Sequence, residues 1–161
     1  MTQYHNIPPV YDKNSRILLL GSFPPVKSRE AQFFYGHPQN RFWKVMSAVL
    51  DCDLPVTVQR KKLMLLSHNI AVWDVIGSCE ITGSSDATIS SVVPNDIAGL
   101  VAETSVTRIF ANGATSYNMY KRYCRDNVGI EAVKLPSTSP ANASFSLERL
   151  ISEWKSQILS Q

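Results

Sequence analysis

The segment RILLLG, residues 16–21, holds four consecutive apolar side chains and ends in a glycine. An apolar run this short, with no polar residue at alternate positions, predicts a strand that is covered on both faces. Strands of this kind belong to parallel sheets that lie between layers of helices. The segment therefore predicts an α/β fold.

Three further segments have the same character and are predicted to be strands: IAVWDVI (70–76), VTRIFAN (106–112) and EAVKLP (131–136). Between the strands, apolar residues recur at helical spacing, which predicts helices at 40–50, 59–68, 94–103, 114–125 and 147–158. Because strands and helices alternate along the whole chain, the sheet should be mostly parallel.

Three local details of this prediction can be checked in the structure. We expect Leu63 and Leu66 on the buried side of the helix at 59–68. Pro94 is suited to the first turn of the helix that follows it, because a proline there loses no hydrogen bond. Residues 77–91, which are mostly small and polar, are expected to form a long loop.

The composition predicts one folded domain over residues 1–161, with residues 1–15 as an N-terminal extension. Hydrophobic residues make up 44% of the chain, and the formal net charge of +3 permits an anionic partner such as nucleic acid. Three scattered cysteines without a CxxC pair predict no metal site and a reducing, cytoplasmic location. No apolar run approaches the about 20 residues that span a bilayer, so we expect no membrane association.

Ligands of a parallel sheet bind beyond the carboxyl ends of its strands. This rule selects the loops at residues 22–28, 74–85, 112–116 and 137–142, which are rich in hydroxyl groups and carry few charges. The chain has no phosphate-binding GxxxxGK[ST] loop and no dinucleotide-binding GxGxxG motif. Hydroxyls and backbone N–H groups suit the phosphates of a nucleic acid, although ordinary solvated turns have the same composition.

The segment GHPQNRFW, residues 36–43, raises the question of what Asn40 does. Asn40 precedes a predicted helix and is a favourable N-cap residue. An asparagine beside a ligand site can alternatively orient a water molecule through its carbonyl oxygen. The two roles are compatible only if the side chain is free of its own helix.

Three motifs in the order GSFPPVKS, FFYGHPQNRFWKVM and LPSTSPAN resemble the uracil-DNA glycosylase superfamily. GSFP together with STSPAN is most similar to its hypoxanthine-DNA glycosylase branch, also called DNA-deoxyinosine glycosylase or family 6. The resemblance implies a three-layer α/β/α sandwich with a central four-stranded parallel sheet. It also implies that the enzyme flips a deaminated base out of DNA and hydrolyses the N-glycosidic bond, without a cofactor and as a monomer.

The resemblance implies roles for individual residues. Phe23 stands where the mismatch-specific branch has a water-positioning asparagine, and Ser137 stands where many relatives have histidine or asparagine. The hypoxanthine branch uses the asparagine of GHPxN instead, so Asn40 is the expected catalytic residue. Expected base-binding residues are Ser22 and Phe23 through their backbone, Tyr35 by stacking, and Asp74 by accepting a base N–H.

Residues expected to bind DNA phosphates are Ser28, His37, Asn112, Ser137, Thr138 and Ser139. Some have a purely structural alternative: His37 can hold its loop, and Asp74 can cap a turn at the end of its strand. Phe34 is an alternative stacking residue to Tyr35.

Three hypotheses follow for the function. The first is a DNA glycosylase that removes hypoxanthine, and the second is a glycosylase for uracil or for mixed substrates. The third is a DNA- or nucleotide-binding domain without catalysis, because the usual catalytic residues of the first and last motifs are missing.

Overall fold

The core of the protein is a four-stranded parallel sheet. The computed structural model describes residues 2–4, 7–23, 33–80 and 90–160. The sheet has the strand order β3-β2-β6-β7, in which all neighbouring strands are parallel. Its strands are β2 (Ile17–Gly21), β3 (Ile70–Asp74), β6 (Arg108–Asn112) and β7 (Ala132–Leu135). All four predicted strands are therefore confirmed, and β2 occupies a central position.

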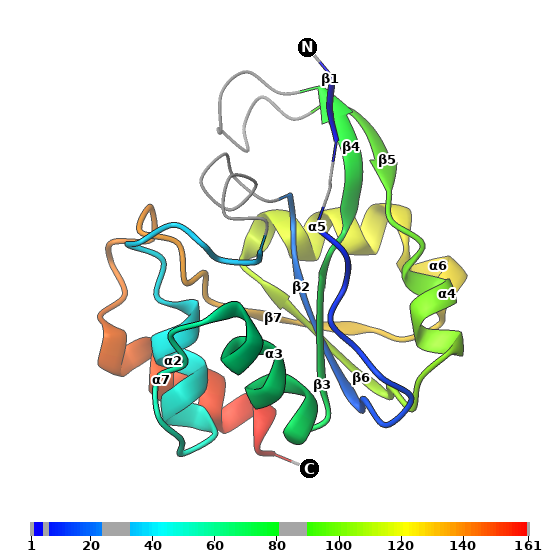
Figure 1. Ribbon diagram of the computed structural model, residues 1–161. Helices are drawn as coiled ribbons and strands as arrows, with labels where there is room; N and C mark the ends of the chain where they lie inside the picture. Colours follow the sequence, from blue (N-terminus) through cyan, green and yellow to red (C-terminus); the bar gives the residue numbers. More distant parts are fainter. Residues whose placement is uncertain (1, 5–6, 24–32, 81–89, 161) are drawn as a thin grey trace.

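Helices cover both faces of this sheet (Figure 1). One face carries α2 (Phe42–Val49), α3 (Val58–Ser67) and α7 (Leu147–Ile158), and the other carries α4 (Ile97–Ala102), α5 (Ala114–Tyr123) and α6 (Arg125–Val128). Along β2, Leu19 packs into the first layer, whereas Leu18 and Leu20 pack into the second. This alternation explains why RILLLG is apolar throughout, and it confirms the predicted α/β/α sandwich.

A second, smaller sheet corrects the prediction of a long polar loop at 77–91. Strands β1 (Thr2–Tyr4), β4 (Ile76–Glu80) and β5 (Ser90–Pro94) pair antiparallel in the order β1-β4-β5. Pro94 ends a strand and does not lie in a helix, because α4 begins after Asp96, whose side chain accepts a hydrogen bond from the backbone N–H of Gly99. The small sheet was missed because its residues carry no continuous apolar run.

The first residues of the chain pack against the main sheet. Ile7 and Val10 are buried in the same core cluster as Leu19, at 2% and 4% exposure. Val10 exchanges two backbone hydrogen bonds of 3.0 Å with Val72 of β3. The segment that the sequence marks as an N-terminal extension thus contributes to the core.

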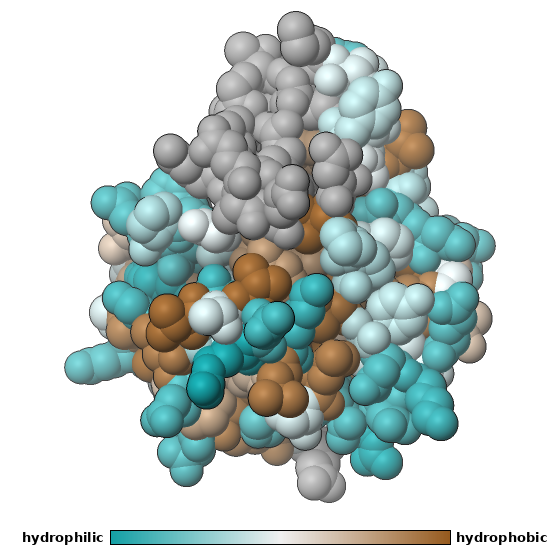
Figure 2. All heavy atoms as spheres, in the orientation of Figure 1, coloured by the Kyte–Doolittle hydropathy of each residue, from teal (hydrophilic) through white to brown (hydrophobic). Residues whose placement is uncertain are grey.

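The prediction for helix α3 is half right. Leu66 is half-buried and packs against the core as expected, but Leu63 is 66% exposed, and the buried residues of the helix are Met64 and Leu65. Figure 2 shows the face of the molecule that includes α3, where apolar and polar side chains are interspersed at the surface. No helix in the described part of the chain is long and apolar enough to cross a membrane.

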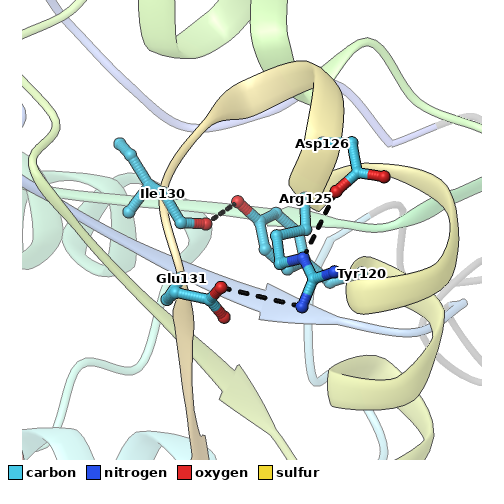
Figure 3. Close-up of polar contacts among 5 residues, drawn as sticks. All are labelled: Tyr120, Arg125, Asp126, Ile130 and Glu131. Carbon is cyan, nitrogen blue, oxygen red and sulfur yellow. Dashed lines mark hydrogen bonds and ion pairs between the residues drawn. The ribbon is translucent and has the colours of Figure 1, made fainter.

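The amino end of β7 is fastened to α5 and α6 (Figure 3). The hydroxyl of the buried Tyr120 donates a 2.6 Å hydrogen bond to the carbonyl of Ile130, and burial raises the pKa of that hydroxyl. The guanidinium of Arg125 lies within ion-pair distance of Asp126 and Glu131, both well exposed. These exposed pairs contribute little to stability. The cluster lies at the opposite end of the strand from the predicted ligand site.

Candidate active site

The carboxyl ends of β2 and β3 approach each other closely at Gly21. A methyl group on Gly21 would overlap Oδ1 of Asp74 and would lie 3.1 Å from the hydroxyl oxygen of Tyr35. Asp74 is only 4% exposed. Glycine at the end of the RILLLG strand is therefore required so that a carboxylate and a phenol can meet there.

Tyr35 enters this site from the loop before α2. Its backbone has a φ of 54°, and its ring stacks on Phe42 with centroids 3.9 Å apart. Phe42 thus covers one face of the Tyr35 ring, so a base could stack only on the other face. Phe34, the alternative stacking residue, is 2% exposed and belongs to the core.

The hydroxyl of Tyr35 is buried, and no group of the described residues forms a well-aligned hydrogen bond with it, although the Asn112 amide lies nearby. Burial raises the pKa of Tyr35 most, and the charge of Asp74 raises it further, while the neighbouring Asn112 amide acts in the opposite direction. The phenol therefore stays protonated throughout the neutral range. A buried donor that the protein leaves unpaired, beside a carboxylate, is a group that a bound ligand can satisfy.

Replacing Tyr35 with phenylalanine tests whether this hydroxyl serves the fold. Because Tyr35→Phe removes a group without a partner, we expect the free energy of unfolding to change by less than about 0.5 kcal/mol or to rise. The matched control is Tyr120→Phe, which loses the bond to Ile130 and should cost about 1 kcal/mol. Urea denaturation measures both. A larger loss for Tyr35→Phe than for Tyr120→Phe would contradict this view of Tyr35.

Asn40 does not have a free carbonyl oxygen. Its Oδ1 accepts a 2.9 Å hydrogen bond from the backbone N–H of Phe42 and a 2.8 Å bond from the hydroxyl of Thr138. Both lone pairs of the oxygen are therefore occupied. This oxygen therefore has no lone pair left with which to orient a water molecule. The N-cap of α2 is Arg41, and Asn40, one residue earlier, bonds the N–H of the first helical residue, Phe42.

Thr138 is a structural partner of Asn40, and its bonds within the protein leave none of its donors for the phosphate that it was expected to bind. The residue is 0% exposed. Its backbone N–H donates to Asn112, its hydroxyl bonds to both asparagines, and its carbonyl accepts from the N–H of Arg41. Asn112 likewise directs its amide toward Thr138, so the two residues join the ends of β6 and β7 to the Asn40 loop.

Ser137, Ser139 and His37 keep donors that a phosphate could use. The hydroxyl of Ser137 accepts from the N–H of Ser139, and that of Ser139 accepts from the N–H of Ala141, which leaves both hydroxyl hydrogens free to donate. Nδ1 of His37 accepts from the N–H of Gln39, so the neutral ring carries its proton on Nε2. His37 therefore holds its own loop, and its Nε2–H remains a donor.

The backbone at Ser22 and Phe23 continues from the central strand. The carbonyl of Ser22 accepts from the N–H of Ile76. The ring of Phe23 is 8% exposed and packs into the core layer that faces α5. Ser28 lies outside the described residues.

Arg41 is a residue that the sequence did not single out. Its guanidinium donates to the carbonyls of Ser139, Asn142 and Phe145, and so clamps the loop after β7 onto α2. These partners lie about a hundred positions away in the chain, so no local sequence pattern predicts the contact. The clamp fixes the Ser137–Ser139 hydroxyls relative to Asn40.

Arg41→Lys should loosen this clamp. A lysine cannot reach three carbonyls with one planar fork, so we expect a loss of about 1–3 kcal/mol in the free energy of unfolding. The exposed Arg60 offers the control Arg60→Lys, which should stay within about 0.5 kcal/mol of wild type. If the two variants had equal free energies of unfolding in urea denaturation, the three hydrogen bonds of Arg41 would not stabilise the fold.

Fold and site together define a class of protein: a parallel α/β domain with a cluster of polar side chains at the carboxyl ends of its strands, next to a hydroxyl-rich loop. The chain belongs to the uracil DNA glycosylase superfamily, whose family model matches residues 8–160.

Individual relatives match over most of their length. The chain is 36% identical to a protein named hypoxanthine DNA glycosylase from Methanosarcina acetivorans, over 92% of this chain and 93% of the relative. It is 33% identical to a hypoxanthine DNA glycosylase from Methanosarcina barkeri, over 84% and 85% of the two chains. A solution NMR structure of a candidate uracil DNA glycosylase from Methanosarcina acetivorans superposes with a TM-score of 0.80 at 34% identity, covering 98% of this chain and 96% of that one.

Proposed function

We propose that this protein is a monofunctional DNA glycosylase that removes hypoxanthine from DNA. The observation that carries the proposal is the meeting of Tyr35 and Asp74 at Gly21, with Asn40 joined through Thr138 to Asn112 at the end of a strand of the same sheet, in a chain of this superfamily. The names of the two relatives indicate hypoxanthine as the base. The reaction adds water across the bond between the sugar C1′ and the base, and yields free hypoxanthine and an abasic site.

The base pocket supports this choice. Asp74 faces the site at the end of β3, where its carboxylate can accept the N1–H of hypoxanthine. The open face of the Tyr35 ring can stack on the base, and the unpaired Tyr35 hydroxyl can donate to one of its acceptor atoms. A carboxylate would accept the N3–H of uracil equally well, so uracil remains the alternative substrate.

The loop after β7 supports binding of the flanking phosphates. The free hydroxyl hydrogens of Ser137 and Ser139 and the Nε2–H of His37 are donors without charge. Such donors position a backbone without selecting its sequence. DNA is the expected partner, and residues 1–161 are expected to act as one unit and as a monomer. The side chains of Cys79 and Cys124 are buried, and the three scattered cysteines of the sequence favour a reducing cytoplasm.

A panel of duplexes that each carry a single hypoxanthine, uracil or xanthine tests the proposal. After incubation with the protein, alkali converts every abasic site into a strand break. We expect breaks at hypoxanthine in preference to the other bases. Breaks only at uracil would contradict hypoxanthine as the substrate and favour uracil. If no duplex broke, the protein would be a binding domain without catalysis.

A further inference from the structure

The orientation of the Asn40 amide is fixed by a group that can only donate. The backbone N–H of Phe42 lies 2.9 Å from one terminal atom of the Asn40 side chain. Because an N–H cannot accept, the atom that faces it must be the oxygen, Oδ1. The amide nitrogen, Nδ2, therefore occupies the other position.

A second backbone N–H fixes the direction of the neighbouring hydrogen bonds. The N–H of Thr138 donates to one terminal atom of Asn112 at 3.0 Å, so that atom is also an oxygen. Nδ2 of Asn112 must then donate to the hydroxyl of Thr138, which lies at 3.0 Å. The hydroxyl hydrogen of Thr138 is thereby left for Oδ1 of Asn40, at 2.8 Å. The chain of donors runs from Asn112 through Thr138 to Asn40.

The only polar capacity that Asn40 retains for a ligand is donation. Its oxygen accepts twice within the protein, and none of the described residues pairs with Nδ2. The side chain is only half-buried, whereas its partner Thr138 is 0% exposed. The buried hydroxyl of Thr138 therefore orients the Asn40 amide, which a substrate can reach.

Building on the proposed function, we propose that Asn40 donates a hydrogen bond from Nδ2 to the departing base, and that Thr138 is the positioning residue that sets this polarity. When the bond between C1′ and the base breaks, its electron pair leaves with the base, and the oxygen of water bonds to C1′. A proton from that water ends on the base. A donor aimed at the base becomes stronger as negative charge gathers there. A donor aimed at the water would instead withdraw the lone pair that the attack requires.

Asn40→Asp separates donation from acceptance. At neutral pH an aspartate accepts from Phe42 and Thr138 as the asparagine does, but it has no hydrogen to donate. We expect single-turnover excision of hypoxanthine to fall about 100-fold or more, as far as in Asn40→Ala, while the melting temperature stays close to that of wild type. An Asn40→Asp rate within tenfold of wild type would overturn the donor role, because only an acceptor survives that exchange.

Thr138 is tested by a pair of variants that differ in one hydroxyl. Thr138→Val keeps the shape and removes the donor, so kcat should fall about tenfold to 100-fold with KM unchanged. Thr138→Ser keeps the hydroxyl and should recover most of that loss. Both rates are measured below the melting temperature of each variant. Equal rates for valine and serine would overturn the positioning role.

A readout without turnover keeps this inference separate from the proposed function. In ¹⁵N NMR spectra, the side-chain amide signals of Asn40 and Asn112 should shift in Thr138→Val and stay near wild type in Thr138→Ser. Unshifted signals in the valine variant would overturn the donor chain. If the wild-type protein released no hypoxanthine, both the proposed function and the donation to a base would be wrong. The amide signals would still show whether the hydrogen bonds run from Asn112 through Thr138 to Asn40.

Discussion

Replacing Asn40 with alanine should lower the single-turnover rate of hypoxanthine excision about 100-fold or more, a loss of about 2.7 kcal/mol in transition-state stabilisation. The side-chain amide of Asn40 is held in place by two internal hydrogen bonds to its oxygen, and no described residue pairs with its nitrogen. Affinity for the duplex should change much less, because the phosphate donors lie on other residues. Excision is followed by the appearance of alkali-labile sites, and affinity by titration of a labelled duplex.

A control separates the catalytic role of Asn40 from its structural role at the start of α2. Thr57 caps α3, where its hydroxyl accepts a 3.1 Å bond from the N–H of Arg60. Thr57→Ala should lose about 1 kcal/mol of stability through the missing cap, and Asn40→Ala a similar amount through the missing bond to the N–H of Phe42. Only Asn40→Ala should lose activity. If the two variants behaved alike in both measurements, the role of Asn40 would be structural only.

The largest effect on stability is expected from Phe42→Ala. The ring is 0% exposed, stacks under Tyr35, and makes edge contacts with Trp43 and Trp154 at centroid distances of 4.8 and 5.9 Å. Truncation leaves a cavity between α2 and α7, so the free energy of unfolding should fall by about 3–5 kcal/mol. For a domain whose total is about 5–15 kcal/mol, this is a large share.

Urea denaturation measures this loss, and Phe42→Leu provides the comparison because it fills most of the space. The leucine variant should lose clearly less than the alanine variant. Tyr35 rests on the Phe42 ring, so Phe42→Ala should also weaken excision at temperatures where the variant is folded. A cost below about 1 kcal/mol would show that this aromatic cluster does not hold the site loop.

The central sheet could be predicted because its signal is local. RILLLG is apolar on both faces, and the structure places helices on both faces of that strand. The small antiparallel sheet could not be predicted in the same way. Strand β4 has only two buried residues, Ile76 and Cys79, and β5 has none, so the information lies in the pairing of these strands with each other and of β4 with β1.

The place of the site could be predicted, but its hydrogen bonding could not. The rule that ligands lie beyond the strand ends selects the loops that hold Asp74, Asn112 and Ser137. The bond between Asn40 and Thr138 joins residues 98 positions apart, and it decides which atom of Asn40 is free. Such a contact depends on the packing of the whole domain. For the same reason Thr138 was expected to be a phosphate ligand, although the structure buries it.

The most direct test of this account is the identity of the released product. A duplex with one deoxyinosine is incubated with an excess of protein, and the small molecules are separated and identified by mass spectrometry. We expect one free hypoxanthine for each abasic site, with the strand intact until alkali is added. Breaks without free base, or a duplex that is bound but keeps its hypoxanthine, would contradict it.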